Sequence, residues 1–222
     1  MTFSIVAHCP RTGAFGMAIS SSSPAVAARC AHARAGVGVV ASQNITDPRL
    51  GPRGLDLAAS GLDAEAIVAE LSADLHSRFR QIAVVDRTGR SATFSGSRTL
   101  GLHGAAQRGG VAAAGNLLGS QAVPTAMVDA FEASEGDLAE RLLTSLEAGL
   151  AAGGEAGPVR SAGLLVVREV AWPIVDLRVD WRCAPILALR ELWDIYAPEV
   201  ENYVRRALAP EDAPSFGVPG DE

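Results

Sequence analysis

The sequence contains no lysine, and all 19 of its basic residues are arginine. Without lysine, the chain has neither a Schiff-base amine nor a lysine general base on its side chains. Its 25 acidic residues give a net charge of −6 at pH 7, whereas a nucleic-acid surface needs clustered basic residues. We therefore expect no nucleic-acid partner.

Cysteine is also scarce: Cys9, Cys30 and Cys183 stand far apart in the sequence. There is no Cys-x-x-Cys pair, and the four histidines are scattered without zinc-ligand spacing. We expect reduced cysteines, as is usual in the cytoplasm, and no metal. The chain also lacks a Gly-x-Gly-x-x-Gly segment after a strand and lacks a P-loop, so we expect no nucleotide cofactor and no cofactor of another kind.

No apolar run approaches the roughly 18 residues that a membrane span needs, and the amino terminus does not look like a signal peptide. These features predict a soluble cytoplasmic protein without a membrane partner. Apolar residues make up 48% of the chain but aromatic residues only 5%, so Ala, Val and Leu must fill the interior. At 222 residues, the chain suits one domain with a large core.

The amino-terminal stretch predicts a β-hairpin, because two β-rich runs flank the turn Pro10–Gly13. If the first run is a central strand, Thr2 is held in place at the start of the sheet. A threonine with a free α-amine carries a nucleophile and a base on one residue. The alternative is that Thr2 has no role, since threonine commonly follows an initiator methionine.

Polar side chains follow several expected strands. Strand ends and the loops after them can present side chains to a ligand while the sheet stays rigid. The candidates for substrate binding are Ser20, Ser21, Ser42, Gln43 and Asn116. A second interpretation treats the segments 20–24 and 42–48 as an ordinary polar loop and turn.

The order of elements predicts paired strands separated by paired helices, which favours antiparallel sheets between helix layers over a parallel fold. Residues 96–110 are expected to form a loop. Two helices are expected over Leu55–Ser60 and Ala64–Leu75, with Asp63 as the N-cap of the second.

We expect a domain over residues 1–183, a helical extension over 184–209 interrupted by Pro198, and a disordered tail over 210–222. The extension has more apolar surface than an exposed helix needs, so we also expect a homo-oligomer.

Several of these segments, in this order, resemble the DUF1028 family of the N-terminal-nucleophile (Ntn) hydrolase-like superfamily. The segments that carry the resemblance are Met1–Ala7, Thr12–Ser20, Ala33–Gln43, Gly51–Leu55, Gly115–Leu118 and Ser161–Val167. The resemblance covers about residues 2–180. It implies an α+β fold, the four-layer αββα sandwich of proteasome subunits, with two antiparallel sheets between helix layers.

The resemblance also implies a chemistry in which Thr2, once Met1 is removed, attacks an amide carbonyl while its own amine accepts the proton. Backbone N–H groups at the end of the strand 36–42 would stabilise the oxyanion, with Asn44 or Asn116 assisting. Proteasome-type members use a lysine and an aspartate. In this chain Arg29 falls near the lysine position and could act only as a positive charge, and Ser20 stands about where the aspartate would be.

The leading hypothesis is an amidohydrolase that cleaves a C–N bond of a small amide, ureido compound or short peptide through Thr2. One alternative is a binding or structural protein that keeps the Ntn fold without its chemistry. Another is a hydrolase with an interior nucleophile such as Ser21 or Cys30.

Overall fold

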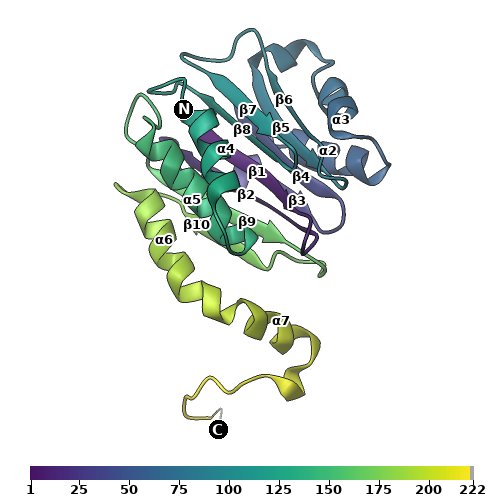
Figure 1. Ribbon diagram of the computed structural model, residues 1–222, viewed down its shortest axis with the longest axis vertical. Helices are drawn as coiled ribbons and strands as arrows, with labels where there is room; N and C mark the ends of the chain where they lie inside the picture. Colours follow the sequence, from purple (N-terminus) through teal and green to yellow (C-terminus); the bar gives the residue numbers. More distant parts are fainter. Residues whose placement is uncertain (221–222) are drawn as a thin grey trace.

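The computed structural model describes residues 1–220 and shows an α+β protein with two antiparallel β-sheets (Figure 1). The first sheet has the strand order β10-β9-β2-β1-β8-β7, and the second has the order β3-β4-β5-β6. The strands of the first sheet are β1 (Thr2–Cys9), β2 (Ala14–Ser21), β7 (Gly104–Arg108), β8 (Val111–Asn116), β9 (Ser161–Val167) and β10 (Val175–Val179). Those of the second sheet are β3 (Ala31–Arg34), β4 (Gly38–Asn44), β5 (Arg80–Asp86) and β6 (Ser91–Ser95).

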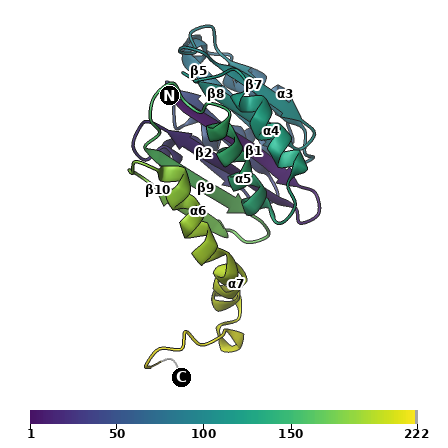
Figure 2. The same cartoon turned by 60° about the vertical axis from the view of Figure 1, so that its left-hand side comes forward.

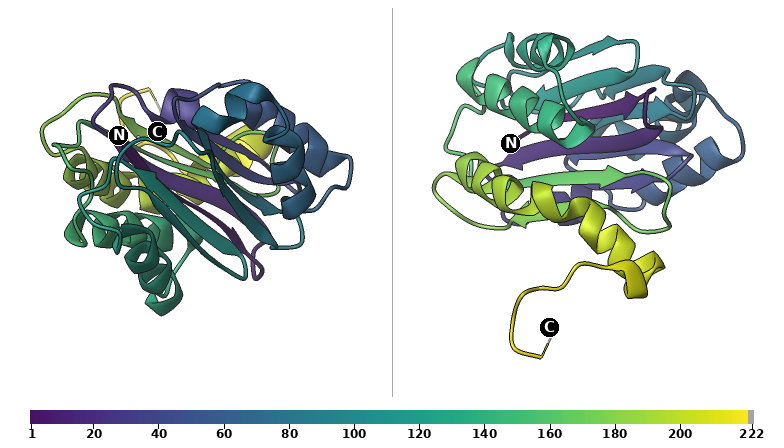
Figure 3. Two further views of the ribbon diagram at one scale, coloured as in Figure 1. Left: turned by 90° about the horizontal axis from the view of Figure 1, so that it is seen from above. Right: turned by 60° about the horizontal axis from the view of Figure 1, so that its bottom comes forward.

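Helices cover the outer face of each sheet. The α-helices are α1 (Ala27–Cys30), α2 (Leu50–Ala59), α3 (Ala64–Leu71), α4 (Val123–Ala133), α5 (Leu138–Ala151), α6 (Pro185–Tyr196) and α7 (Val200–Leu208). Three short 3₁₀ helices are Leu75–Phe79, Ala197–Glu199 and Pro210–Asp212. Helices α4, α5 and α6 pack on the first sheet, and α2 and α3 pack on the second (Figure 3). The result is the expected four-layer αββα sandwich.

Strand β1 is buried on both faces, which follows from its sequence and position. Alternate residues of a strand point to opposite faces. Phe3 and Ile5 belong to the core beneath α4 and α5, while Val6 belongs to the core between the two sheets. The strand pairs with β2 on one side and β8 on the other, so its backbone is bonded along both edges and its first residue cannot fray.

Helix α6 is part of the main core. Leu189 and Trp193 pack into the cluster over the first sheet, and the indole N–H of Trp193 donates to Glu140 at 2.8 Å. The helix ends just before Pro198, as the sequence predicts, and α7 continues in a new direction (Figure 2). Leu187 and Ile195 remain exposed, and the homo-oligomer stays a prediction. Residues 221–222 of the expected tail lie outside the described residues.

Two elements differ from expectation. Strand β7 lies inside the segment expected to be a loop; it has no β-branched or aromatic residue and sits at a sheet edge, where pairing with β8 defines it. Helix α2 begins at Leu50, earlier than the expected Leu55, because Pro52 lies in the first turn, where a missing backbone N–H costs little. Within residues 1–220, no helix combines the length and apolar character needed to cross a membrane.

Close packing of α5 on the first sheet depends on Gly16. A Cβ added at Gly16 would lie 2.8 Å from Leu142 Cδ1 and 2.8 Å from the Leu165 carbonyl oxygen. We predict that Gly16→Ala lowers the free energy of unfolding by about 1–3 kcal/mol, because the backbone oxygen cannot move aside. Gly109→Ala is the matched control, since an added Cβ there meets nothing within 4 Å. Urea denaturation that gives equal losses for the two variants would contradict the packing argument.

Candidate functional site

Thr2 is the first residue of β1, and its side chain is only 5% exposed. Its backbone lies opposite Asn116 of β8. On the other side, Phe3 pairs with Ser20, which places Ser21 beside Thr2. Thr2 is therefore held in place at the start of a central strand, as expected from the sequence.

A polar layer closes one end of the space between the two sheets. Strand alternation turns the side chain of Thr2 to the same face as Val6, toward the second sheet. The other side chains of this layer come from β1, β2, β4, β5 and β8 and are 0–1% exposed. They are Ser4, Ser21, Gln43, Gln81 and Asn116.

Hydrogen bonds join the two sheets through this layer. Ser4 Oγ donates to Gln43 Oε1 at 2.7 Å, and Gln43 Nε2 donates to Gln81 Oε1 at 2.8 Å. Gln43 Nε2 also donates to the carbonyl of Ala114 at 3.1 Å, and Asn116 Nδ2 donates to Gln81 Oε1 at 3.2 Å. Each amide fixes the next, so the rotamers around Thr2 are locked.

Asn116 has one unused acceptor. Its Oδ1 atom is buried and has no hydrogen-bond partner among the described residues. A buried polar atom without a partner costs about 1–3 kcal/mol, and such atoms are rare enough to need an explanation. Because Asn116 lies opposite Thr2 on the same face, this oxygen is an available acceptor at the start of β1.

Two hydroxyls meet at an amide carbonyl. Thr2 Oγ1 lies 3.3 Å from Ser21 Oγ, and both hydroxyls donate to the carbonyl oxygen of Met1. Ser21 Oγ itself accepts the backbone N–H of Ser23 at 3.0 Å, which orients its proton away from the loop. The pair can therefore hold an amide oxygen.

Glu155 is the carboxyl group beside this site. It is 7% exposed, and both of its oxygens accept the backbone N–H of Ser22 at 3.1 Å. Burial raises the pKa of Glu155 to about 7, against the opposing effects of the terminal ammonium charge and Ser22. Burial also raises the pKa of the Cys30 thiol to about 11, which disfavours the thiolate that a cysteine nucleophile needs.

The structure brings Ser21, Gln43 and Asn116 together with Thr2, and it places the other predicted residues elsewhere. Ser42 and Asn44 alternate with Gln43 and so face the opposite side of β4. Ser42 bonds to Thr46 at 3.2 Å, and Asn44 bonds to the carbonyl of Phe79 and the N–H of Leu100.

Ser20 and Arg29 are likewise directed away from Thr2. Ser20 faces the helix layer and donates to the carbonyl of Ser161 at 2.9 Å. Arg29 is half-buried and donates to the carbonyls of Pro24 and Ala25 at 2.7 and 3.1 Å. Its guanidinium thus stabilises the loop after β2.

Sequence reasoning missed Ser4, Gln81 and Glu155. Ser4 could have been predicted, because it is two residues after Thr2 in the same strand and so shares its face. Gln81 could also have been predicted, because it is a polar residue at the start of a buried run. Glu155 follows two glycines in a connecting segment, and nothing in its surroundings signals a role.

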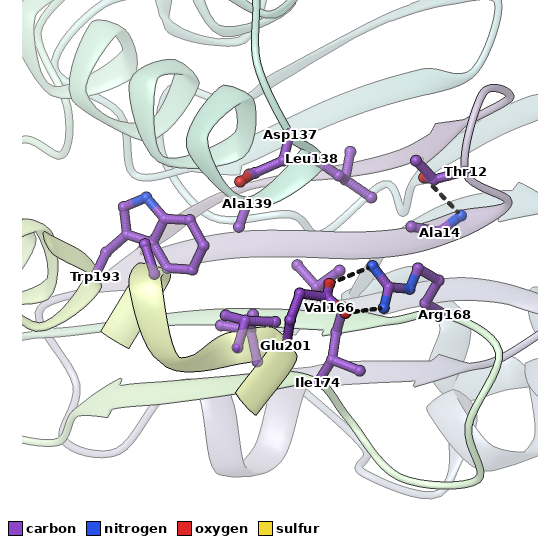
Figure 4. A pocket seen from close by; sticks show the side chains of 13 residues that line it. Thr12, Ala14, Asp137, Leu138, Ala139, Val166, Arg168, Ile174, Trp193 and Glu201 are labelled. Carbon is purple, nitrogen blue, oxygen red and sulfur yellow. Dashed lines mark hydrogen bonds and ion pairs between the residues drawn. The ribbon is translucent and has the colours of Figure 1, made fainter. Parts of the chain in front are cut away.

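A separate cavity of about 190 Å³ lies at the other end of the β1–β2 hairpin (Figure 4). Its walls come from β9, β10, α5, α6 and α7, and include Val166 and Trp193. Arg168 bonds to Glu201 at its edge with two hydrogen bonds of 2.8 and 3.1 Å. The cavity contains none of the predicted site residues.

The raised pKa of Glu155 predicts a pH-dependent stability. The folded protein holds the proton more tightly than the unfolded chain, so this contribution is fully present below about pH 4.5 and is lost as pH rises through about 7. In Glu155→Gln this loss should be absent, so between pH 5 and pH 8 the free energy of unfolding of the variant should rise by about 2 kcal/mol relative to the wild type. This is less than the full pKa shift would give, because some solvent contact remains. Glu70→Gln, at an exposed position, is the control; denaturation curves for Glu155→Gln that parallel the wild type at every pH would contradict this account.

Comparison with known proteins identifies relatives. A family model described as "Family of unknown function (DUF1028)" matches residues 2–189. The crystal structure of protein SPO2555 from Silicibacter pomeroyi, assigned to the same family, has 33% sequence identity and a TM-score of 0.85, over 92% of this chain and 90% of that one. Anbu (ancestral beta-subunit) from Yersinia bercovieri has 10% identity and a TM-score of 0.40, over 90% and 97% of the two chains.

No curated protein matches the chain significantly. The family model covers most of the sequence, and the Silicibacter relative shares the fold along nearly its whole length. The protein is a member of the DUF1028 family.

Proposed function

We propose that the protein is an Ntn-type amidohydrolase of the cytoplasm that cleaves a C–N bond of a small amide, ureido compound or short peptide. Thr2 is its nucleophile once Met1 has been removed. The observation that carries the proposal is the Thr2 hydroxyl, held at the buried start of a central strand with Ser21 beside it and an amide carbonyl against both.

Removal of Met1 turns the backbone nitrogen of Thr2 into a free amine on the residue that bears the hydroxyl. The hydroxyl attacks the substrate carbonyl carbon while the amine accepts its proton. The C–N bond then breaks, the leaving amine takes that proton, and an ester on Thr2 remains. Water hydrolyses this ester and regenerates Thr2.

Neighbouring residues supply the rest of the chemistry. Ser21 Oγ already donates to an amide oxygen, so it is the proposed donor to the oxyanion, a contribution worth about 3 kcal/mol for a well-placed group. Asn116 Oδ1 is the proposed acceptor for a proton of the Thr2 amine. An α-amine has a pKa of about 8 in model peptides, which makes it a base near neutral pH without a lysine to lower that value.

The second candidate function is a non-catalytic binding or structural protein. It is favoured by the absence of lysine from the sequence and by Ser20 in place of an aspartate, because proteasome-type chemistry uses both groups. A retained Met1 would also tie up the amine and occupy both hydroxyls. In that case the polar layer between the sheets serves only to fix their register. The two candidates differ in whether Met1 is present in the working protein.

We predict that intact-mass measurement of the protein from its own cells finds Met1 removed. On a panel of small amides, ureido acids and short peptides, Thr2→Ala should lower kcat at least about 1,000-fold, because alanine keeps the α-amine but lacks the hydroxyl that attacks the carbonyl. Thr2→Ser should keep measurable turnover, and Thr12→Ala, at the exposed turn, is the control. Retained Met1, or equal kcat for Thr2→Ala and wild type, would refute Thr2 as nucleophile.

A further inference from the structure

Met1 occupies the candidate site as an aminoacyl group. It carries a free ammonium, it is joined to Thr2 by an amide, and its carbonyl accepts from the Thr2 and Ser21 hydroxyls. The surroundings of each part of Met1 indicate what kind of molecule this space accepts.

The side chain of Met1 rests on Gly157. A Cβ added at Gly157 would lie 3.1 Å from Met1 Cε and 3.6 Å from Met1 Sδ, and no other atom lies within 4 Å of it. The absence of a side chain at this position gives the thioether a flat backbone surface. Gly157 keeps an ordinary negative or extended φ, so close approach, and not a special conformation, is what glycine provides here.

The charged terminus of Met1 lies near a buried carboxyl, that of Glu155, without forming an ion pair with it. Among the described residues, the hydrogen bonds of the Glu155 carboxylate come from Ser22, and it forms no ion pair with an arginine. The positive charge of the chain terminus is close enough to lower the pKa of Glu155. A buried carboxylate with no fixed cation favours a cationic ligand.

A hollow of about 290 Å³ continues from Glu155 and Gly157 toward the start of α6. Its walls are mainly apolar, with Leu150 of α5 on one side and Ile186 and Leu187 of α6 on another. Because Gly157 lines this hollow and also contacts the Met1 thioether, the hollow offers room for an apolar side chain next to the position of Met1. Small-molecule sites combine an apolar lining with a few placed polar groups in this way.

We propose that the site takes α-aminoacyl amides, meaning amides of an amino acid with a free ammonium and a linear apolar side chain, and that Glu155 binds the ammonium. This inference rests on the proposed function, in which Thr2 cleaves the amide. The Met1 carbonyl carbon is covalently bonded to the Thr2 nitrogen. In the Met1-free protein the substrate carbonyl is not bonded to that nitrogen, so it lies further from it. Hydrolysis releases the free amino acid and the amine, and consumes one water.

The test uses the full chain without Met1, produced as a fusion that is cleaved immediately before residue 2. It carries Thr2→Ala to stop turnover. Calorimetry measures binding of L-methioninamide and of N-acetyl-L-methioninamide, which has the same side chain without the charge. We expect the charged amide to bind at least tenfold more tightly. Adding Glu155→Gln should weaken its binding at least tenfold and change that of the acetylated amide less than twofold.

Gly157→Val tests the side-chain contact, because only Met1 lies near an added Cβ. This substitution should weaken the binding of L-methioninamide at least fivefold more than the binding of glycinamide. Equal affinity for the charged and acetylated amides, or equal losses for both in Glu155→Gln, would overturn the inference. Thr2-dependent hydrolysis of acetylated or ureido amides without binding of L-methioninamide would overturn it while sparing the proposed function. Tight L-methioninamide binding without hydrolysis in the Thr2 protein would support the recognition site and count against the proposed nucleophile.

Discussion

The structure depends on the pairing of β1 along both of its edges. Antiparallel ladders to β2 and β8 bond the backbone from its second residue onward, and apolar side chains bury both faces. A chain terminus normally frays because it loses entropy on ordering without gaining contacts. Here the contacts of a central strand hold it, and that constraint places a hydroxyl and a backbone nitrogen at a fixed point.

The second constraint is the change from apolar to polar side chains along the space between the sheets. Most of that space is filled by Val, Ala, Met and Phe side chains, but its end at Thr2 is filled by hydroxyls and amides that bond to one another. An apolar layer would have packed more simply, since each buried polar group must find a partner. The polar layer includes one acceptor without such a partner, Asn116 Oδ1, and it lies beside Thr2.

Much of the fold could be predicted from local sequence. The hairpins follow from β-rich runs around Gly-containing turns, and Asp63 was recognisable as a helix N-cap, which its bond to the Ala66 N–H confirms. Strand β7 could not be predicted, because its pairing with β8, and not its own composition, makes it a strand. The same holds at the site. Alternation within one strand separates Gln43 from Ser42 and Asn44, but Glu155 reaches the backbone of Ser22, next to the site, only through the packing of a distant connecting segment.

The central claim is that the Thr2 hydroxyl is a nucleophile. The most direct test is mass-spectrometric mapping of the Met1-free protein after reaction with a β-lactone probe, which forms an ester with an activated hydroxyl. The account predicts one adduct, on Thr2, that is lost when the protein is unfolded before labelling. An adduct on Ser21 or Cys30, or no adduct on the folded protein, would contradict it.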